Sequence, residues 1–362
     1  MDLFAEMQTR GHEQINFFCE PEFGIRGAVA IHSTALGPAL GGCRMWNYPS
    51  EEDAIIDVLR LSRGMTYKAA VTGLNLGGGK AVIIGNSKTD KSEALLRAFG
   101  RFVEGMGGRY ITAEDVGTSV EDMEIVRRET RYVTGIAQDK GGGGDPSRVT
   151  ARGVFAGIRA AVEARLGRKD LEGLKVAIQG VGHVGMHLAG QLHREGARLF
   201  VSDIDSSRVG KAIDQYSAQA VGLDEIYGLE VDVFAPCALG AAVNDDTIDR
   251  FRCSVVAGSA NNVLYRPRHG DELVKRNILY APDYVVNAGG VINVYQELNG
   301  YNEEKALRQA DAIYDTLREI FELSKREDIA PYQASDRLAE KRIRRAKDAR
   351  ADRLHNLFLP GR

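Results

Sequence analysis

Residues 74–85, LNLGGGKAVIIG, place Lys80 directly after three glycines and before an apolar run. A glycine-rich loop that ends in lysine suggests phosphate binding, and a P-loop requires the pattern G-x-x-x-x-G-K-[ST]. Leu74 stands where that pattern needs its first glycine, and Ala81 stands where it needs a hydroxyl group for magnesium. The sequence therefore excludes a P-loop here, and the lysine requires another explanation.

Two other charged residues could act with Lys80 in acid–base chemistry. Lys68 precedes it in GMTYK, and Asp115 follows it in ITAEDVG. Two lysines that face one small pocket repel each other's charge, so one could serve as a general base while the other holds a substrate carboxylate. Asp115 could then relay a proton, and the glycines before Lys80 would leave room for a small substrate. From residue types alone, the alternative is three ordinary surface charges.

A second glycine motif, G-x-G-x-x-G at residues 180–185, indicates dinucleotide binding because a strand pattern precedes it and an amphipathic helix pattern follows it. Gly180 would form the turn, Gly182 would let the backbone approach a pyrophosphate, and Gly185 would let the helix pack closely. The N–H groups at the start of the helix would bind the phosphates. We expect the whole motif to line the cofactor: Gly180, Val181, Gly182, His183, Val184 and Gly185.

Asp203 ends the strand pattern that follows this motif, about 20 residues beyond the glycines, where the dinucleotide fingerprint places an acid. A carboxylate at this position accepts hydrogen bonds from the ribose hydroxyl groups and repels a 2′-phosphate, which predicts NAD rather than NADP. Arg208 lies nearby in the sequence and could weaken that preference. The alternative for the whole motif is a glycine turn that serves packing only.

The elements that must hold these residues follow an α/β pattern. Ser50 and Asp53 resemble a capping box at the start of the first long helix. In the N-terminal part we expect helices at 50–71 and 92–106 and strands at 27–34 and 80–85. Near-continuous apolar runs later in the chain predict a parallel, doubly wound sheet. Its strands are expected at 175–180, 198–203, 231–237, 253–259 and 278–286. From about Asn302 the pattern is helical, with a break at Pro331.

The best internal boundary lies at residues 139–147, DKGGGGDPS. Glycine loses more backbone freedom on ordering than any other residue, so four consecutive glycines disfavour regular structure. This stretch is therefore a hinge or mobile loop, or alternatively a passive linker. A chain of 362 residues is long enough for two domains on either side of it.

Composition indicates a globular protein. The net charge of −3 implies no general attraction to nucleic acid or membranes. No apolar run is long enough to span a membrane, and the N-terminus lacks a signal-peptide pattern. Acidic residues interrupt the basic stretch at 338–362, which favours a solvated or subunit-packing helix over a nucleic-acid-binding tail. The cysteines form no CxxC pair, which predicts free thiols in a reducing cytoplasm and no metal site: Cys19, Cys43, Cys237 and Cys253.

Several longer motifs are specific enough to be compared with known families: GPALGGCRMW, GMTYK, GLNLGGGK, GRYITAEDVGT, GVGHVG, APCALGA and APDYVVNAGGVINV. Together they closely resemble the amino-acid dehydrogenases of the glutamate/leucine/phenylalanine/valine superfamily, from about residue 16 to about residue 345. The resemblance implies an α/β substrate domain at 1–140, completed by C-terminal helices at 330–362. It implies a Rossmann-type NAD-binding domain at 141–329. It also implies a homo-oligomer, often an octamer.

The same resemblance implies a reaction and assigns roles to residues. The reaction is the reversible oxidative deamination of an L-amino acid to a 2-oxo acid and ammonium. Lys80 matches the catalytic lysine, Lys68 the carboxylate-binding lysine and Asp115 the proton-transfer aspartate. The remaining matches are the asparagine near substrate and nicotinamide, the threonine near the nicotinamide amide and the glycines at the substrate entrance: Asn262, Thr150, Gly41 and Gly42.

The residues that correspond to the substrate side-chain pocket are aliphatic or small: Leu40, Ala113, Val291 and Val294. Such a pocket would bury a branched side chain, at about 0.8 kcal/mol per methylene, and offers no charge to a second carboxylate. We therefore expect leucine, and also valine or isoleucine, as substrates. The alternatives are a valine or phenylalanine dehydrogenase of the same family and a non-catalytic NAD-binding sensor. The chain departs from the family pattern at Cys43, His183 and Arg148, and the last puts the loop geometry near the cofactor in question.

Overall fold

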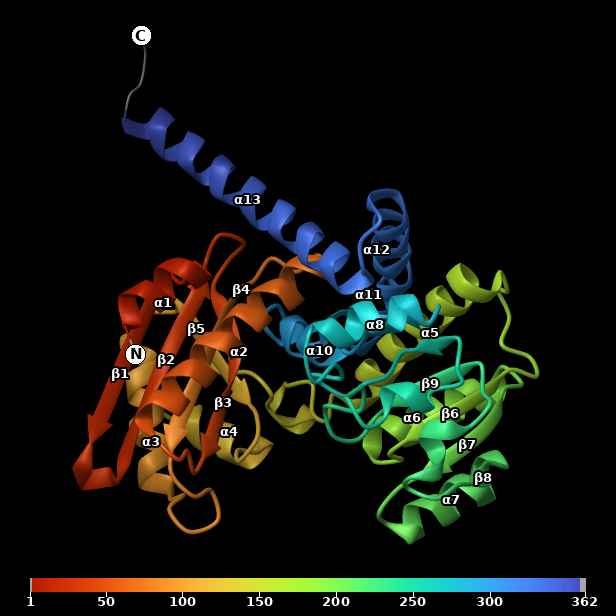
Figure 1. Ribbon diagram of the computed structural model, residues 1–362. Helices are drawn as coiled ribbons and strands as arrows, with labels where there is room; N and C mark the ends of the chain where they lie inside the picture. The colour runs from red at the N-terminus through yellow and green to blue at the C-terminus, as the bar shows by residue number, and fades with distance from the viewer. Residues whose placement is uncertain (1, 359–362) are drawn as a thin grey trace. The chain divides into compact units, whose positions relative to one another are not determined.

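The computed structural model describes residues 2–358, with side chains up to residue 350. The described chain forms two compact units. The first unit contains the chain up to Asp145, then Val294–Asn302, and the part that begins at Ala339. The second unit contains Pro146–Asn293 and Glu303–Leu338. Each unit has its own sheet with flanking helices (Figure 1).

The first unit is built on a five-stranded sheet in the order β1-β2-β4-β3-β5. β1 and β4 run antiparallel to β2, whereas β3 is parallel to both β4 and β5. The strands are β1 (Gln14–Glu20), β2 (Ile25–Ser33), β3 (Ala39–Trp46), β4 (Gly77–Ile84) and β5 (Tyr110–Glu114). The prediction that a strand starts at Lys80 is wrong. Gly77 and Gly78 already pair with Ala39 and Leu40 of β3, so Lys80 lies inside the strand.

Helices cover both faces of this sheet. α2 (Glu51–Val71) lies across the strands on one face (Figure 1), where Val58 and Leu59 pack against Val82. On the other face, Phe99 and Tyr110 belong to the apolar cluster under α3 and α4. In the stretch of the chain up to Asp145, the helices of this unit are α1 (Leu3–Arg10), α2, α3 (Glu93–Gly105) and α4 (Val120–Val126). Lys80 shares its strand face with Val82, because alternate residues of a strand point the same way, and therefore faces α2.

The second unit contains a six-stranded sheet in the order β11-β10-β9-β6-β7-β8, and every strand pair in it is parallel. The predicted doubly wound sheet is thereby confirmed. Its strands are β6 (Lys175–Gln179), β7 (Arg198–Ser202), β8 (Gln219–Ala220), β9 (Val233–Pro236), β10 (Val255–Val256) and β11 (Leu279–Tyr280). Its helices include α5 (Ser147–Leu166), α6 (His183–Arg194), α7 (Ser206–Tyr216), α8 (Arg268–Lys275), α9 (Asp283–Val286), α11 (Glu303–Asp311) and α12 (Ile313–Glu327). α10 (Gly289–Glu297) is shared between the two units.

The last two predicted strands are much shorter than expected. The segment 253–259 contributes only β10, and 278–286 contributes β11 followed by the helix α9. Pro282 explains the second difference, because proline has no N–H to donate to a strand ladder and is well placed at the start of a helix. The apolar run continues through Val285 and Val286, but these residues are buried on a helix.

Two local sequence signals are confirmed. The Ser50 hydroxyl accepts a hydrogen bond from the Asp53 backbone N–H at 3.1 Å and caps α2. α12 ends at Glu327, and α13 (Pro331–Phe358) begins at Pro331, as the predicted break requires.

Part of the basic C-terminal stretch folds onto the first unit. Arg342 of α13 donates hydrogen bonds to the carbonyl oxygens of Ala70 at 2.9 Å and Gly73 at 3.0 Å. Tyr67 of α2 donates to Glu340 at 2.8 Å. The side chains beyond residue 350 lie outside the described ones. Over the described chain, helices are either too short or too polar to cross a membrane.

A pair of histidines, His32 buried and His12 half-buried, contacts α2. The rings of His12 and His32 meet edge to face, with centroids 4.8 Å apart. The His32 ring contacts the Thr66 hydroxyl at 2.8 Å and the Arg10 carbonyl at 3.0 Å. Burial lowers the pKa of His32 to about 3, and the charge of His12 acts in the same direction. Both histidines therefore favour the folded chain while they are neutral.

We expect this pair to make the stability of the first unit depend on acid. Because the folded pKa of His32 lies below its ordinary value of 6.5, its stabilisation is complete above pH 6.5 and is lost as the pH falls toward about 3. The loss should reach roughly a few kcal/mol, at about 1.4 kcal/mol per pKa unit. In denaturant titrations across this range, His32→Asn should flatten the pH dependence of the unfolding free energy. The exposed His187→Asn should keep the wild-type dependence, and equal slopes in both variants would contradict this account.

Candidate active site

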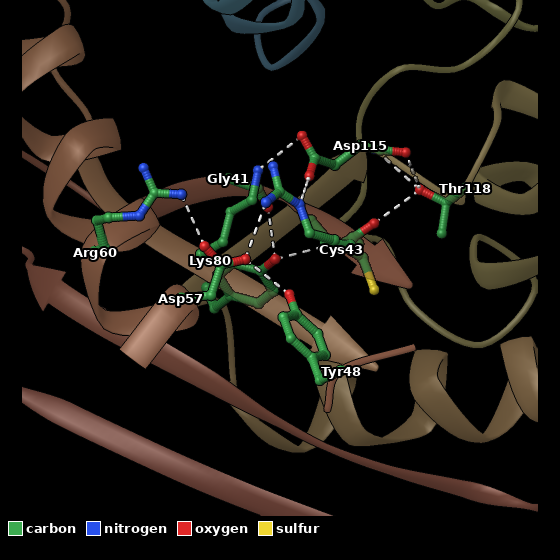
Figure 2. A network of polar contacts seen from close by, with 11 residues as sticks. Gly41, Cys43, Tyr48, Asp57, Arg60, Lys80, Asp115 and Thr118 are labelled. Carbon is green, nitrogen blue, oxygen red and sulfur yellow. Dashed lines mark hydrogen bonds and ion pairs between the residues drawn. The ribbon is translucent and has the colours of Figure 1, made fainter. Parts of the chain in front are cut away.

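Lys80 and Asp115 form a buried ion pair in the first unit. The Lys80 Nζ atom lies 3.0 Å from the Asp115 Oδ1 atom, and Lys80 is only 5% exposed (Figure 2). Lys80 comes from the middle of β4, whereas Asp115 follows the last residue of β5. The structure therefore brings together two residues that are far apart in the sequence.

The register of the sheet explains how the two side chains meet across β3. Cys43 pairs with Ala81, so Gly42 lies level with Lys80, and Gly42 also pairs with Ala113 of β5. A side chain at Gly42 would lie 2.9 Å from the Asp115 Cβ atom and 2.3 Å from a backbone oxygen. Because Gly42 has no side chain, Asp115 can approach Lys80 across β3.

The glycines before Lys80 have a structural function that the sequence did not suggest. A Cβ atom at Gly77 would lie 2.0 Å from the Ser33 carbonyl oxygen, and at Gly78 2.1 Å from the Thr66 nitrogen of α2. At Gly79 it would lie 2.7 Å from the Tyr110 ring. Protein atoms occupy the space beside these glycines, so the prediction that they leave room for a substrate is wrong. They let α2 and the neighbouring strands approach β4 closely.

Asp115 is the common acceptor of two cations. Its Oδ1 atom faces Lys80, and its Oδ2 atom accepts a hydrogen bond from the Arg44 Nε atom at 2.8 Å. Burial by itself raises the pKa of Asp115, but Lys80 and then Arg44 outweigh it and hold the pKa below its ordinary value. The Thr118 hydroxyl accepts from the Asp115 backbone N–H at 2.9 Å and donates to the Cys43 carbonyl at 2.8 Å, which fixes the loop after β5.

Arg44 is a site residue that the sequence reasoning missed. It lies two residues after Gly42, inside the family-like motif GPALGGCRMW. The strand pattern could have identified it, because residues two apart on a strand point to the same face of the sheet. Arg44 therefore shares the face of Gly42, which also carries Lys80 and Asp115.

Lys68 lies on α2 and is half-buried. Its carbonyl oxygen accepts from the Thr72 hydroxyl at 2.6 Å, which ends the helix. Asp57 lies eleven residues earlier on α2, close to three full turns of 3.6 residues, so both residues share one face of the helix. The expected role of Lys68 in carboxylate binding stays a prediction.

The expected substrate-pocket residues divide between the units. Leu40 and Ala113 are buried on one face of the first sheet, the face that carries Gly42. Gly41 is closely packed, with its missing Cβ position 1.8 Å from the Gly79 carbonyl oxygen. Of the two valines on α10, Val291 belongs to the second unit and Val294 to the first.

The glycine motif of the second unit has the geometry expected of a dinucleotide loop. Gly180 has φ +95°, a conformation that favours glycine, and donates to the Ser202 carbonyl at 2.7 Å. A Cβ atom at Gly185 would lie 2.1 Å from the Gly180 carbonyl oxygen, so Gly185 permits close helix packing. At Gly182 the nearest atom, from Arg208, would be 3.7 Å away. The motif thus leaves open the position at which a pyrophosphate would approach.

Asp203 ties this motif to the next strand. Its Oδ2 atom accepts from the Val181 backbone N–H at 2.8 Å, and its Oδ1 atom accepts from Asp205 at 2.9 Å. Each carboxylate oxygen has a second lone pair for a ribose hydroxyl group. A pocket of about 420 Å³ adjoins Asp203 and contains the apolar side chains of Ile204 and Leu239, which are 89% and 86% exposed. Exposed apolar side chains around a pocket are typical of a ligand site.

The other expected cofactor residues occupy varied environments. Thr150 on α5 donates to the Pro146 carbonyl at 3.0 Å, and His183 is the exposed first residue of α6. Val181 is fully buried and Val184 half-buried, so these side chains serve packing. Asn262 has φ +52°, and its carbonyl oxygen accepts from Ala241 at 2.7 Å.

Arg148, one of the positions at which the chain departs from the family pattern, forms an ion pair with Glu303 at 2.8 Å. Both side chains are largely exposed, at 61% and 40%. Exposed ion pairs contribute little to stability. Arg148 is the second residue of α5, which begins at Ser147.

Two family models match the chain. One, described as Glu/Leu/Phe/Val dehydrogenase, dimerisation domain, matches residues 13–132. The other, described as Glutamate/Leucine/Phenylalanine/Valine dehydrogenase, matches residues 141–209 and 201–351.

Individual relatives agree with these matches. Leucine dehydrogenase from Geobacillus stearothermophilus is 54% identical over 98% of this chain and 97% of its own length. Phenylalanine dehydrogenase from Thermoactinomyces intermedius is 47% identical over 96% of each chain. The crystal structure of L-tryptophan dehydrogenase from Nostoc punctiforme superposes with a TM-score of 0.87 and 48% identity, over 96% of this chain and 99% of that one.

Proposed function

Since the chain belongs to the Glu/Leu/Phe/Val dehydrogenase family and is an amino-acid dehydrogenase, we propose that it catalyses the reversible, NAD-dependent oxidative deamination of branched-chain L-amino acids. The products would be 2-oxo acids and ammonium. The observation that carries the proposal is the buried Lys80–Asp115 pair, at 3.0 Å, beside Leu40 and Ala113 on the same sheet face. It combines a proton-transfer pair with aliphatic walls.

In the deaminating direction, bound NAD would supply the acceptor for the hydride that leaves the amino-acid Cα atom. Lys80 would activate the water that attacks the resulting imine, and Asp115 would take and return the protons. Lys68 and Asn262 would hold the substrate carboxylate. Burial of Lys80 supports this assignment, because a base that is shielded from bulk water exchanges protons with its neighbour and the substrate.

The second unit supports NAD as the cofactor. Gly182 is open to a pyrophosphate at the start of α6, and Asp203 presents a carboxylate beside an apolar pocket. A carboxylate there repels a 2′-phosphate, which favours NAD over NADP. Arg208, whose guanidinium lies near Gly182, is the group that would reduce this preference.

Aromatic amino acids are the alternative substrates. The relatives named for phenylalanine and tryptophan are nearly as similar to the chain as the one named for leucine. The small Ala113 favours no side-chain shape by itself, whereas Leu40 limits the width of a pocket on that sheet face. We also propose a homo-oligomer, an octamer by family resemblance, and the exposed Phe17 on the edge strand β1 is consistent with a subunit contact.

Initial rates of NADH formation with a panel of L-amino acids test the proposal. We expect kcat/KM for leucine, valine and isoleucine to exceed that for phenylalanine and tryptophan by about tenfold or more, since misfit of a methylene or two is worth roughly 1–3 kcal/mol. NAD should be preferred over NADP. Faster turnover of an aromatic amino acid would establish the alternative substrate class. Calorimetric NAD binding without turnover of any amino acid would indicate the non-catalytic sensor.

A further inference from the structure

We propose that Arg44 is a positioning residue for the deamination reaction, which holds Asp115 against Lys80 and connects this pair to helix α2. The inference rests on the proposed function, because it concerns the same site. It assigns a role to a residue that the motif comparison left without one. The contacts of the Arg44 guanidinium with Asp57 and Asp115 carry it. Figure 2 labels these two carboxylates.

The guanidinium bridges two carboxylates from different elements. Its Nε atom donates to the Asp115 Oδ2 atom at 2.8 Å, and its Nη1 atom donates to the Asp57 Oδ2 atom at 2.9 Å. Since Lys80 contacts the other oxygen of Asp115, the carboxylate is held from both sides and cannot rotate without losing an ion pair. The planar, rigid fork of arginine suits such a bridge, and lysine cannot reproduce both contacts.

The far end of the bridge is itself fixed. Asp57 also accepts from the Tyr48 hydroxyl at 2.8 Å and from Arg60 at 2.8 Å. Asp57 is 15% exposed and Arg44 21% exposed, so both groups are largely shielded from solvent. Arg44 therefore bonds a carboxylate on α2 that has further hydrogen-bond partners, and through it connects that helix to Asp115.

α2 is also the helix that carries Lys68, on the face it shares with Asp57. The Arg44–Asp57 contact consequently fixes the position of α2, and with it Lys68, the proposed carboxylate-binding lysine, relative to β3 and β4. The Arg44 guanidinium thus connects the proton-transfer pair, Lys80 and Asp115, to the helix that carries the proposed substrate-binding lysine.

Arg44 also keeps Asp115 ionised while Lys80 changes its protonation state. A guanidinium stays charged at every accessible pH. Burial raises the pKa of Asp115, and the Lys80 and Arg44 cations lower it, so loss of the Lys80 proton leaves Arg44 as the remaining counter-ion. Acidic groups that interact electrostatically with Asp115 repel its charge when they are ionised: Glu114, Tyr110, Cys43 and Tyr48. Helix α2 adds the cation Lys68, on the face that it shares with Asp57.

Arg44→Met and Arg44→Lys test the role through the pH profile of leucine deamination. We expect Arg44→Met to lower kcat roughly 10- to 100-fold, the range for a misplaced catalytic group, and to move the acid limb of the kcat profile to higher pH. Arg44→Lys retains the charge and should keep the acid limb near its wild-type position with a smaller loss of kcat. Asp57→Asn should keep the limb as well but raise KM for the amino acid, because it releases α2.

Arg97→Met is the matched control, because Arg97 forms an arginine–carboxylate pair with Glu129 at 2.5 Å in the same unit but outside the site. It should change neither kcat nor the acid limb. If the acid limb of the kcat profile of Arg44→Met lies at the same pH as in the wild type, the inference is overturned.

A second measurement separates this inference from the proposed function. A wild-type chain that deaminates no amino acid contradicts the proposed function. The coupling of Arg44 with Asp115 is then still measurable in unfolding free energies of the single variants and the double variant Arg44→Met/Asp115→Asn. A coupling for this pair, and none for Arg97→Met with Asp115→Asn, supports the positioning role. Equal couplings overturn it.

Discussion

Lys80→Met is expected to lower kcat for amino-acid deamination by roughly 10³-fold or more, at the upper end of the range for a general base. Methionine fills a similar volume on β4 but can neither accept a proton from water nor exchange one with Asp115. NAD binding should be unchanged, because the glycine motif and Asp203 belong to the second unit. The measurement is kcat with leucine at saturating NAD, together with the calorimetric affinity for NAD.

The fold should tolerate this change. After removal of Lys80, Asp115 retains its ion pair with Arg44 at 2.8 Å, so no buried charge is left without a partner. Lys91→Met is the matched control, since Lys91 forms a comparable pair with Asp122 at 2.6 Å in the same unit but outside the site. It should retain wild-type kcat. If Lys80→Met also keeps kcat within about tenfold of wild type, Lys80 is not the base.

The parts of the site that depend on contiguous sequence were the most predictable. The turn at Gly180, the close packing at Gly185 and the acid at Asp203 all follow from one strand, one loop and one helix, because the fingerprint encodes them locally. The structure matches the conformational part of those expectations, with φ +95° at Gly180 and close helix packing at Gly185. The expected contact of Asp203 with a ribose stays a prediction. The boundary of α2 at Ser50 was predictable for the same reason.

The first unit was less predictable because its site is assembled by strand register. Gly42, Lys80 and Ala113 come to one level only through the parallel pairing of β3 with β4 and β5. No local pattern reveals that pairing, and the bridge from Arg44 to Asp57 could not be foreseen for the same reason. The glycines before Lys80 illustrate a second limit, since composition shows that a side chain is absent but not which neighbour occupies the space.

Asp115→Asn should lower kcat roughly 10²- to 10³-fold, since it removes the group that exchanges protons with Lys80. Unlike Lys80→Met, it should also destabilise the fold. The neutral amide leaves two cations, Lys80 and Arg44, at one carboxylate position with no anion between them. Losing one partner of a largely buried pair costs about 3–5 kcal/mol, and the 22% exposure of Asp115 reduces this to about 2–4 kcal/mol.

The pH dependence of this loss distinguishes electrostatics from packing. The pKa of folded Asp115 lies below its ordinary value of 3.8, so its stabilisation is complete above pH 3.8 and is lost only as the pH falls through the lower folded value. The difference in unfolding free energy between wild type and Asp115→Asn should therefore be constant from neutral pH down to about pH 4 and decrease at lower pH. A packing loss would persist there, and the His32 effect already changes below pH 6.5. Glu114→Gln is the matched control, because the pKa of Glu114 is shifted in the opposite direction to that of Asp115. Burial and neighbouring acids raise the pKa of Glu114, so its neutralisation should not destabilise the chain. If Asp115→Asn is as stable as Lys80→Met, Asp115 is not the shared counter-ion of the two cations.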